Sequence, residues 1–126
     1  SHRIRFSDYG LNYPEDGLYV TEQYYKKHKD AVDKFVRASR RGWEYARTHR
    51  EEALDISMKV IAEFNVATNR TFQRLMLDEI LQLQVNPVTG KADYAPVRHE
   101  VFEELNRSLC EAGILHSTLK YEEMIR

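Results

Sequence analysis

The sequence has few of the residues that cross-link or interrupt a chain: one cysteine, three prolines and five glycines in 126 residues. The single cysteine, Cys110, cannot form an intrachain disulfide, and the missing CxxC pair excludes the usual zinc and redox motifs. Scarce glycine and proline disfavour an all-β chain with many tight turns. No apolar run approaches the roughly 20 residues of a membrane-spanning helix. The composition therefore predicts a helix-rich globular fold without disulfides.

An excess of one charge is lacking as well. The chain carries 19 Lys and Arg against 20 Asp and Glu, which gives a formal net charge of −1. Nucleic-acid binders usually show a clear basic excess, so no nucleic-acid partner is expected. The hydrophobic fraction of 42% excludes intrinsic disorder, and the length fits one domain.

What the sequence does have is helical periodicity, which continues from Thr21 almost to the end. Apolar residues recur there at steps of three and four, the spacing of a helix with one face on a core. The fold class we predict is mainly α, with five to six helices and one or two short N-terminal strands. The expected helices span 21–29, 30–46, 51–64, 71–83, 96–112 and 118–125, and the expected strands lie at 4–9 and 18–20. The apolar stripe of the 71–83 helix is Phe72, Leu75, Met76, Ile80 and Leu83.

No constellation of catalytic or metal-binding residues is visible. The histidines lack the HExxH spacing, and neither a GxSxG elbow nor a glycine-rich phosphate loop occurs. His99 and Glu103 lie four residues apart and could share a helix face, where a solvated pair is expected rather than a metal site. Cys110 is expected to be a buried structural thiol. We therefore predict no enzyme activity, no metal and no cofactor.

A basic cluster lies on the predicted second helix and just after it, and consists of Arg37, Arg40, Arg41, Arg47 and Arg50. Arginines so arranged could contact phosphates. Glu44, Glu51 and Glu52 interleave with them at ion-pair spacing, which favours a solvated, ion-paired face instead.

Tyrosines crowd the first 25 residues, at positions 9, 13, 19, 24 and 25, beside Asp8, Asn12 and Asp16. Aromatic rings with a few polar groups on a loop are typical of small-molecule pockets. Packing and turn formation explain the same residues about as well, and both interpretations stay open on the residues alone.

The order of several segments carries more information than any one of them. Asp8-Tyr9-Gly10 precedes Gly17-Leu18-Tyr19-Val20-Thr21, then Phe35-Val36-Arg37-Ala38 with Gly42 and Tyr45-Ala46, then Glu51-Glu52-Ala53. In this order they resemble the carboxy-terminal part of ABC-transporter substrate-binding proteins of the nitrate/sulfonate/taurine type, and most closely the thiamine-pyrimidine-synthase-like branch. Thr48-His49-Arg50 departs from the family, which often has a proline before the glu-glu-ala helix.

The resemblance implies the C-terminal portion of a two-lobed α/β periplasmic-binding-protein-like fold whose N-terminal half is absent from this chain. Residues 1–20 would then form a strand and loop entering the ligand cleft, and residues 21–126 the helical part. The ligand-binding residues it implies are Asp8, Tyr9, Gly10, Asn12 and Tyr13. Tyr9 would stack on a planar ring such as an aminopyrimidine, and Asp8 would accept its amino hydrogens.

The same resemblance implies a small-molecule ligand, namely a thiamine-precursor pyrimidine or a sulfonate- or nitrate-like solute. It also implies an ABC permease as partner of the full-length parent, in a periplasmic or membrane-anchored extracytoplasmic setting. The catalytic segment of the enzymatic branch is not in this chain, so no catalytic residue is carried over. Two other hypotheses are a ligand-sensing domain of a signalling protein and a free-standing helical interaction domain. If the chain lacks its partner lobe, an apolar face should stay exposed and favour a homodimer.

Overall fold

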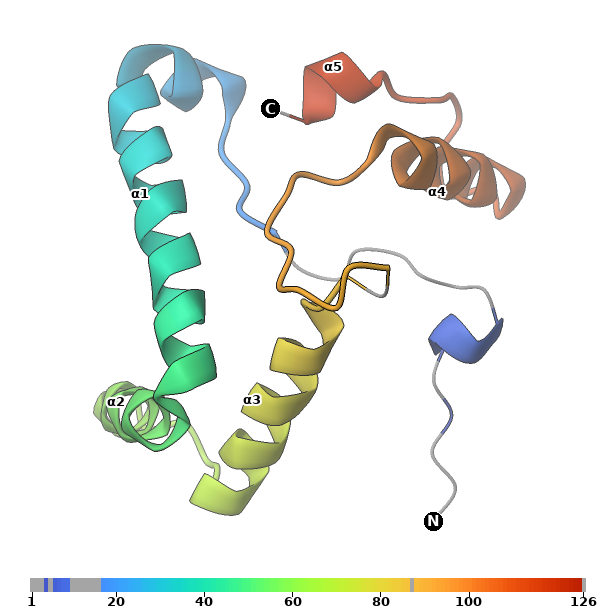
Figure 1. The fold of residues 1–126 in the computed structure, drawn as a ribbon. Coiled ribbons are helices and arrows are strands. Elements are labelled where there is room, and N and C mark those ends of the chain that lie inside the picture. The colour runs from blue at the N-terminus through green and yellow to red at the C-terminus, as the bar shows by residue number, and fades with distance from the viewer. Residues whose placement is uncertain (1–3, 5, 10–16, 87, 126) are drawn as a thin grey trace. The chain divides into compact units, whose positions relative to one another are not determined.

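The computed structural model describes residues 4, 6–9, 17–86 and 88–125, and this part of the chain is mainly helical (Figure 1). A short 3-10 helix, η1 (Phe6–Tyr9), comes first. The α-helices that follow are α1 (Glu22–Thr48), α2 (Arg50–Glu63), α3 (Arg70–Leu83), α4 (His99–Glu111) and α5 (Tyr121–Met124). The predicted fold class, mainly α with five to six helices, is confirmed.

The two predicted N-terminal strands are wrong where the structure describes them. Phe6–Tyr9 is a 3-10 helix, and residues 18–20 form no strand. Apolar alternation over a few residues makes a strand only when a neighbouring strand supplies hydrogen bonds. Within the described ranges, the β-pairing is limited to a single antiparallel bridge between Val85 and Ala92.

The chain divides into two compact units, each considered by itself below. One consists of residues 1–18 and 95–126, and the other of residues 19–94. The second unit holds α1, α2 and α3, and the first holds α4 and α5.

In the unit of residues 19–94, α1 begins where the sequence predicts and is kinked next to the predicted boundary at Lys29. The side chain of Thr21 accepts a hydrogen bond from the Tyr24 amide at 3.2 Å, which caps the helix N-terminus. The backbone at His28 is non-helical, with φ −132° and ψ 32°. The 22–48 element therefore consists of two helical stretches joined across a kink at His28, close to the boundary predicted between the 21–29 and 30–46 helices. Asp30, just after the kink, pairs with Lys34.

The core of this unit is small and takes one side chain from each helix. Ala46 of α1, Leu54 of α2 and Leu81 of α3 are its buried apolar residues, and Leu54 and Leu81 are only 2% and 1% exposed. The turn from α1 to α2 is a single residue, His49, whose amide bonds to the Tyr45 carbonyl at 2.8 Å. A connection this short forces α2 to leave α1 at an angle and brings Leu54 back against it.

Ion pairs join α2 to α3 along one side. Glu51 contacts Arg70 at 2.9 Å and Arg74 at 2.7 Å, and Arg50 contacts Asp78 at 3.0 Å. Arg70 also bonds to Asp55, and this hydrogen bond, followed by the one to Glu51, raises the pKa of the Arg70 guanidinium. The four bridges fix which side of α3 faces α2.

We expect Glu51→Gln to lower the melting temperature by at most a few degrees, because exposed ion pairs contribute little to stability. The decrease should shrink in about 1 M salt, where the Debye length is about 3 Å. Circular dichroism melts of both proteins at low and high salt measure it. Glu63→Gln is the matched control, since Glu63 is exposed on the same helix and makes no recorded ion pair. An equal loss at both salt concentrations would contradict a screened, purely electrostatic contribution.

In the other unit, an asparagine holds the segment after α4. Asn106 is 3% exposed, and its side chain donates to the Leu119 carbonyl at 2.9 Å and accepts from the Leu119 amide at 3.2 Å. Tyr121 packs edge-on against Phe102, with ring centroids 5.4 Å apart. These contacts seat α5 beside α4.

Helix α4 begins three residues later than predicted from Pro96. The Tyr121 hydroxyl donates a hydrogen bond to the Val97 carbonyl at 2.5 Å. In a helix that started at Pro96, this carbonyl would instead accept an intrahelical hydrogen bond. The first intrahelical bond instead joins the Phe102 amide to the Arg98 carbonyl at 3.0 Å. Gly113, with φ 71°, ends the helical segment directly after the predicted limit at residue 112.

Candidate functional site

The predicted ligand-binding segment is described only in part. Asp8 and Tyr9 are consecutive residues of η1 and both are exposed, with Tyr9 at 72%. Neither side chain makes a hydrogen bond, ion pair or ring contact with another described residue. Gly10, Asn12 and Tyr13 lie outside the described residues. The assignment of these five residues to a binding site therefore stays a prediction.

The exposed state of Asp8 and Tyr9 defines what they can offer a ligand. A phenol ring without a stacked neighbour presents its faces to a planar molecule, and ring pairs of this kind stack at centroid distances of about 4.5–7 Å. The adjacent carboxylate accepts hydrogen bonds only, so it suits amino or imino hydrogens. The pair has the chemistry to hold a planar nitrogen heterocycle.

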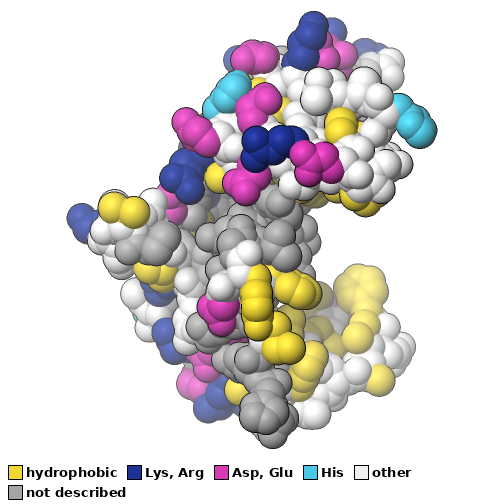
Figure 2. Space-filling view, turned by 90° about the vertical axis from the view of Figure 1, so that its right-hand side faces the viewer, with side chains coloured by type: hydrophobic (Ala, Val, Ile, Leu, Met, Phe, Trp, Pro, Cys, Tyr) yellow, Lys and Arg dark blue, Asp and Glu magenta, His cyan; other side chains and the backbone are white. Residues whose placement is uncertain are grey.

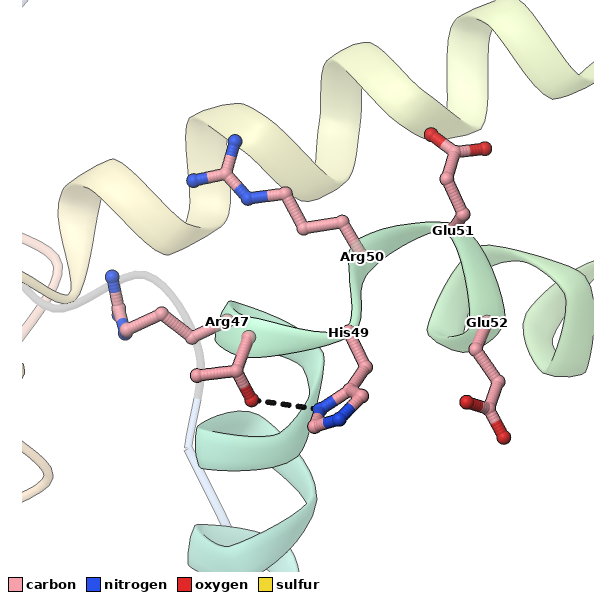
Figure 3. A pocket seen from close by; sticks show the side chains of 6 residues that line it. Arg47, His49, Arg50, Glu51 and Glu52 are labelled. Atoms are coloured by element: carbon pink, nitrogen blue, oxygen red, sulfur yellow. Dashed lines mark hydrogen bonds between the residues drawn. The ribbon is translucent and has the colours of Figure 1, made fainter.

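A pocket of about 430 Å³ lies at the corner between α1 and α2 (Figure 3). Its lining comes entirely from the corner itself: Arg47, Thr48, His49, Arg50, Glu51 and Glu52. In Figure 3, Arg50 and Glu51 extend toward α3, whereas His49 and Glu52 extend to the other side. No pocket at this corner was expected from the sequence.

The cations at this corner have structural partners. Arg47 donates to the Leu81 carbonyl at 3.0 Å and to the Gln84 side chain at 3.3 Å, and so ties α1 to the C-terminal end of α3. Its Nε atom is buried and makes no hydrogen bond. Arg50 is held by Asp78. Two arginines engaged in this way orient the helices, and we assign the corner a structural role.

On the other side of the corner, two rings and a carboxylate make a small cluster. The Tyr45 hydroxyl donates to Glu52 at 2.7 Å, and the Tyr45 ring stacks on His49 with centroids 4.2 Å apart and planes 4° apart. The hydrogen bond to Glu52 raises the pKa of Tyr45, helped by partial desolvation and by the carboxylate charge. The cluster spans the single-residue turn and fixes its angle.

We expect Glu52→Gln to lower the pKa of Tyr45 toward its ordinary value near 10, because a neutral amide removes the negative charge and the strong acceptor. NMR titration of the labelled tyrosine ring carbons, assigned with Tyr45→Phe, measures this shift. The other tyrosines serve as internal controls and should titrate unchanged. An unmoved Tyr45 titration would show that the hydrogen bond is not formed in solution.

The expected pairing of the basic cluster is wrong in its details. Glu51 binds arginines of α3 and Glu52 binds Tyr45, so neither neutralises Arg37, Arg40 or Arg41. Those three arginines are exposed and make no ion pair with any described residue. Intrahelical spacing cannot find a partner 19 residues away, such as Arg70 for Glu51. A tertiary contact decided these pairs.

Two smaller expectations can be compared directly. His99 and Glu103 do share a helix face, 4.0 Å apart and each more than half exposed, as predicted for a solvated pair. Cys110 is partly exposed rather than fully buried.

Among the residues that the structure describes, no group of three or more histidine, cysteine or carboxylate side chains could hold a metal ion. No helix in the described ranges is long and apolar enough to cross a membrane.

Comparison with known proteins gives two findings. Residues 2–53 match the family model described as NMT1/THI5 like. Over 113 residues, or 90% of its length, the chain is 26% identical to the riboflavin-binding protein RibY of Chloroflexus aurantiacus. It spans about a third (32%) of the length of that relative. No solved structure matches the chain significantly.

Both findings point to the group of proteins that the ordered motifs indicated. The family match covers Asp8, Tyr9 and the Gly17–Thr21 segment, and it ends at Ala53, within the glu-glu-ala motif. The similarity to the riboflavin-binding relative extends over most of the remaining helices. The predicted resemblance to ABC substrate-binding proteins of the thiamine-pyrimidine-synthase-like branch is therefore confirmed, with residues 2–53 carrying the NMT1/THI5-like match.

Proposed function

We propose that this chain is the carboxy-terminal part of the solute-binding component of an ABC uptake system, and that its ligand is a planar nitrogen heterocycle. The observation that supports this most is the NMT1/THI5-like match over residues 2–53, which includes all five predicted ligand-binding residues. Because the chain spans 32% of its relative, the two-lobed protein, its permease and its extracytoplasmic location all belong to this proposal.

The chemistry of the predicted segment favours one class of ligand over the other. A sulfonate or nitrate ion would have to approach the carboxylate of Asp8, which repels anions. An aminopyrimidine or a flavin carries N–H groups that can donate hydrogen bonds to a carboxylate. Each also has a planar ring on which Tyr9 can stack. The name of the riboflavin-binding relative adds a flavin to the pyrimidine as a ligand to test.

Binding by the chain itself can be measured with riboflavin and an aminopyrimidine. Stacking on a tyrosine should quench flavin fluorescence, and the pyrimidine should compete for the same site. We expect Tyr9→Ala to weaken binding by about tenfold, since an aromatic pair contributes about 0.5–1.5 kcal/mol beyond its buried area. Asp8→Asn should weaken it by a similar factor, because the charged acceptor is lost.

Tyr19→Ala is the matched control, because Tyr19 is also exposed and lies in the family match but outside the predicted site. Its affinity should equal that of the unmodified chain. Binding of taurine or nitrate in preference to both heterocycles would overturn the ligand class. Absence of binding to every one of these solutes, both by the chain and by the two-lobed protein of which it is proposed to be part, would overturn the proposed function.

A further inference from the structure

Two exposed aromatic rings lie on the same side of η1. Phe6 and Tyr9 are the first and last residues of this four-residue 3-10 helix, and their side chains are 73% and 72% exposed. A 3-10 helix has three residues per turn, so side chains at positions i and i+3 eclipse each other. In the strand predicted for residues 4–9, the same two side chains would point to opposite faces. The helical turn is therefore what brings the two rings together.

Both rings have free faces. Hydrophobic side chains gather in the lower half of Figure 2, at the level and on the side at which η1 (dark blue) lies in Figure 1. Neither Phe6 nor Tyr9 makes a ring contact with another described residue. Each side chain can therefore turn to meet a bound molecule, and we call the space between these two rings the η1 slot.

The spacing of the rings suits the thickness of one planar molecule. Three residues at a rise of about 2.0 Å separate the two Cα atoms by about 6 Å along the helix axis. An aromatic ring between two others needs a gap of about 7 Å, since carbon atoms make their best contact at about 3.5 Å on each side. A small outward tilt of the two exposed side chains supplies the difference. A saturated ring, with hydrogens above and below its plane, needs a wider gap.

We propose that Phe6 is a second ligand-binding ring, and that Phe6 and Tyr9 hold a planar heterocycle between them in the η1 slot. The inference rests on the proposed function, in which Tyr9 stacks on such a ligand, and it adds the opposite side of the site. Asp8 lies a third of a turn away on the same helix, so its carboxylate is at the edge of the slot. There it can accept hydrogen bonds from the N–H groups at the rim of the ligand.

Phe6→Ala should weaken the binding of riboflavin about three- to tenfold, as Tyr9→Ala does, because each removes one stacked ring. The 126-residue chain is titrated into dilute riboflavin up to about 1 mM, the range of weak complexes, and the quenching of flavin fluorescence gives the affinity. Phe35→Ala is the matched control, because Phe35 is also exposed, at 62%, and lies in the family match but outside η1. Its affinity should equal that of the unmodified chain.

Two further variants separate stacking from simple burial of apolar surface. Phe6→Leu should weaken binding almost as much as Phe6→Ala, because leucine has no planar face. Phe6→Trp should bind at least as tightly as the unmodified chain, because a larger ring keeps the stack. An aminopyrimidine should displace riboflavin. Piperidine, a saturated ring that also carries N–H groups, should not displace it at the same concentration.

The outcomes distinguish this inference from the proposed function. If Tyr9→Ala weakens binding and Phe6→Ala does not, the η1 slot is overturned and the proposed function is retained. Full affinity in Phe6→Leu, equal weakening by Phe35→Ala, or displacement by piperidine would also overturn the slot. So would a chain that binds no riboflavin at about 1 mM, and binding by the two-lobed protein would then decide the proposed function.

Discussion

Leu81→Ala should lower the free energy of unfolding of the 19–94 unit by about 2–5 kcal/mol, the usual cost of truncating a fully buried leucine. Leu81 is 1% exposed and lies in a core that includes only two other buried apolar residues among those described, Ala46 and Leu54. A cavity in so small a core has few neighbours that could move to fill it. Since whole domains are stable by about 5–15 kcal/mol, this one substitution should remove a large share of the stability.

Urea denaturation followed by circular dichroism measures this loss, and Leu83→Ala is its matched control. Leu83 is the same residue type on the same helix but 74% exposed, so its truncation should cost less than about 0.5 kcal/mol. Similar destabilisation by both substitutions would mean that the two sides of α3 are buried alike in solution. That result would also contradict the exposure of Leu83.

Asn106→Ala should destabilise the packing of the 119–124 segment on α4 by about 1–3 kcal/mol. The substitution removes two hydrogen bonds to the Leu119 backbone, at 3.2 and 2.9 Å, and an intramolecular hydrogen bond contributes about 0.5–1.5 kcal/mol net. The Asn106 side chain is 3% exposed, so its truncation also leaves space in a packed contact.

Amide hydrogen exchange reports this contact directly. The Leu119 amide should be protected in the unmodified chain and should exchange much faster in the variant. Arg107→Ala serves as the control, since Arg107 is the exposed neighbour on α4 and makes no recorded contact. Unchanged protection of Leu119 in Asn106→Ala would show that the two hydrogen bonds do not hold the segment.

Much of the helical architecture could be predicted from local chemistry. Thr21 and Asn69, both good N-cap residue types, cap α1 and α3, and Gly113 adopts the positive φ that ends α4. Capping and chain reversal depend on residues within three or four positions, so sequence alone contains the necessary information. The predictions that were wrong concern elements whose conformation depends on contacts with distant residues, namely the short N-terminal strands and the start of α4.

The candidate site divides in the same way. The ordered motifs were sufficient to indicate the family, which the match over residues 2–53 bears out. They could not indicate the Tyr45–Glu52 contact or the Arg47 bonds to α3, because residues 7 and 34 or more positions apart meet there only through the α1–α2 corner.

The sequence alone therefore determined the mainly helical fold class, two of the helix caps and the family resemblance. Only the tertiary structure decided which apolar residues are inside. The periodicity of α3 favours the side with Phe72, Leu75, Met76 and Leu83, because it has more large apolar residues, yet Leu81 on the opposite side is the buried one. The ion pairs of Arg50 with Asp78 and of Glu51 with Arg70 and Arg74 turn that opposite side toward α2. Periodicity finds apolar faces, but contacts between helices select the one that packs.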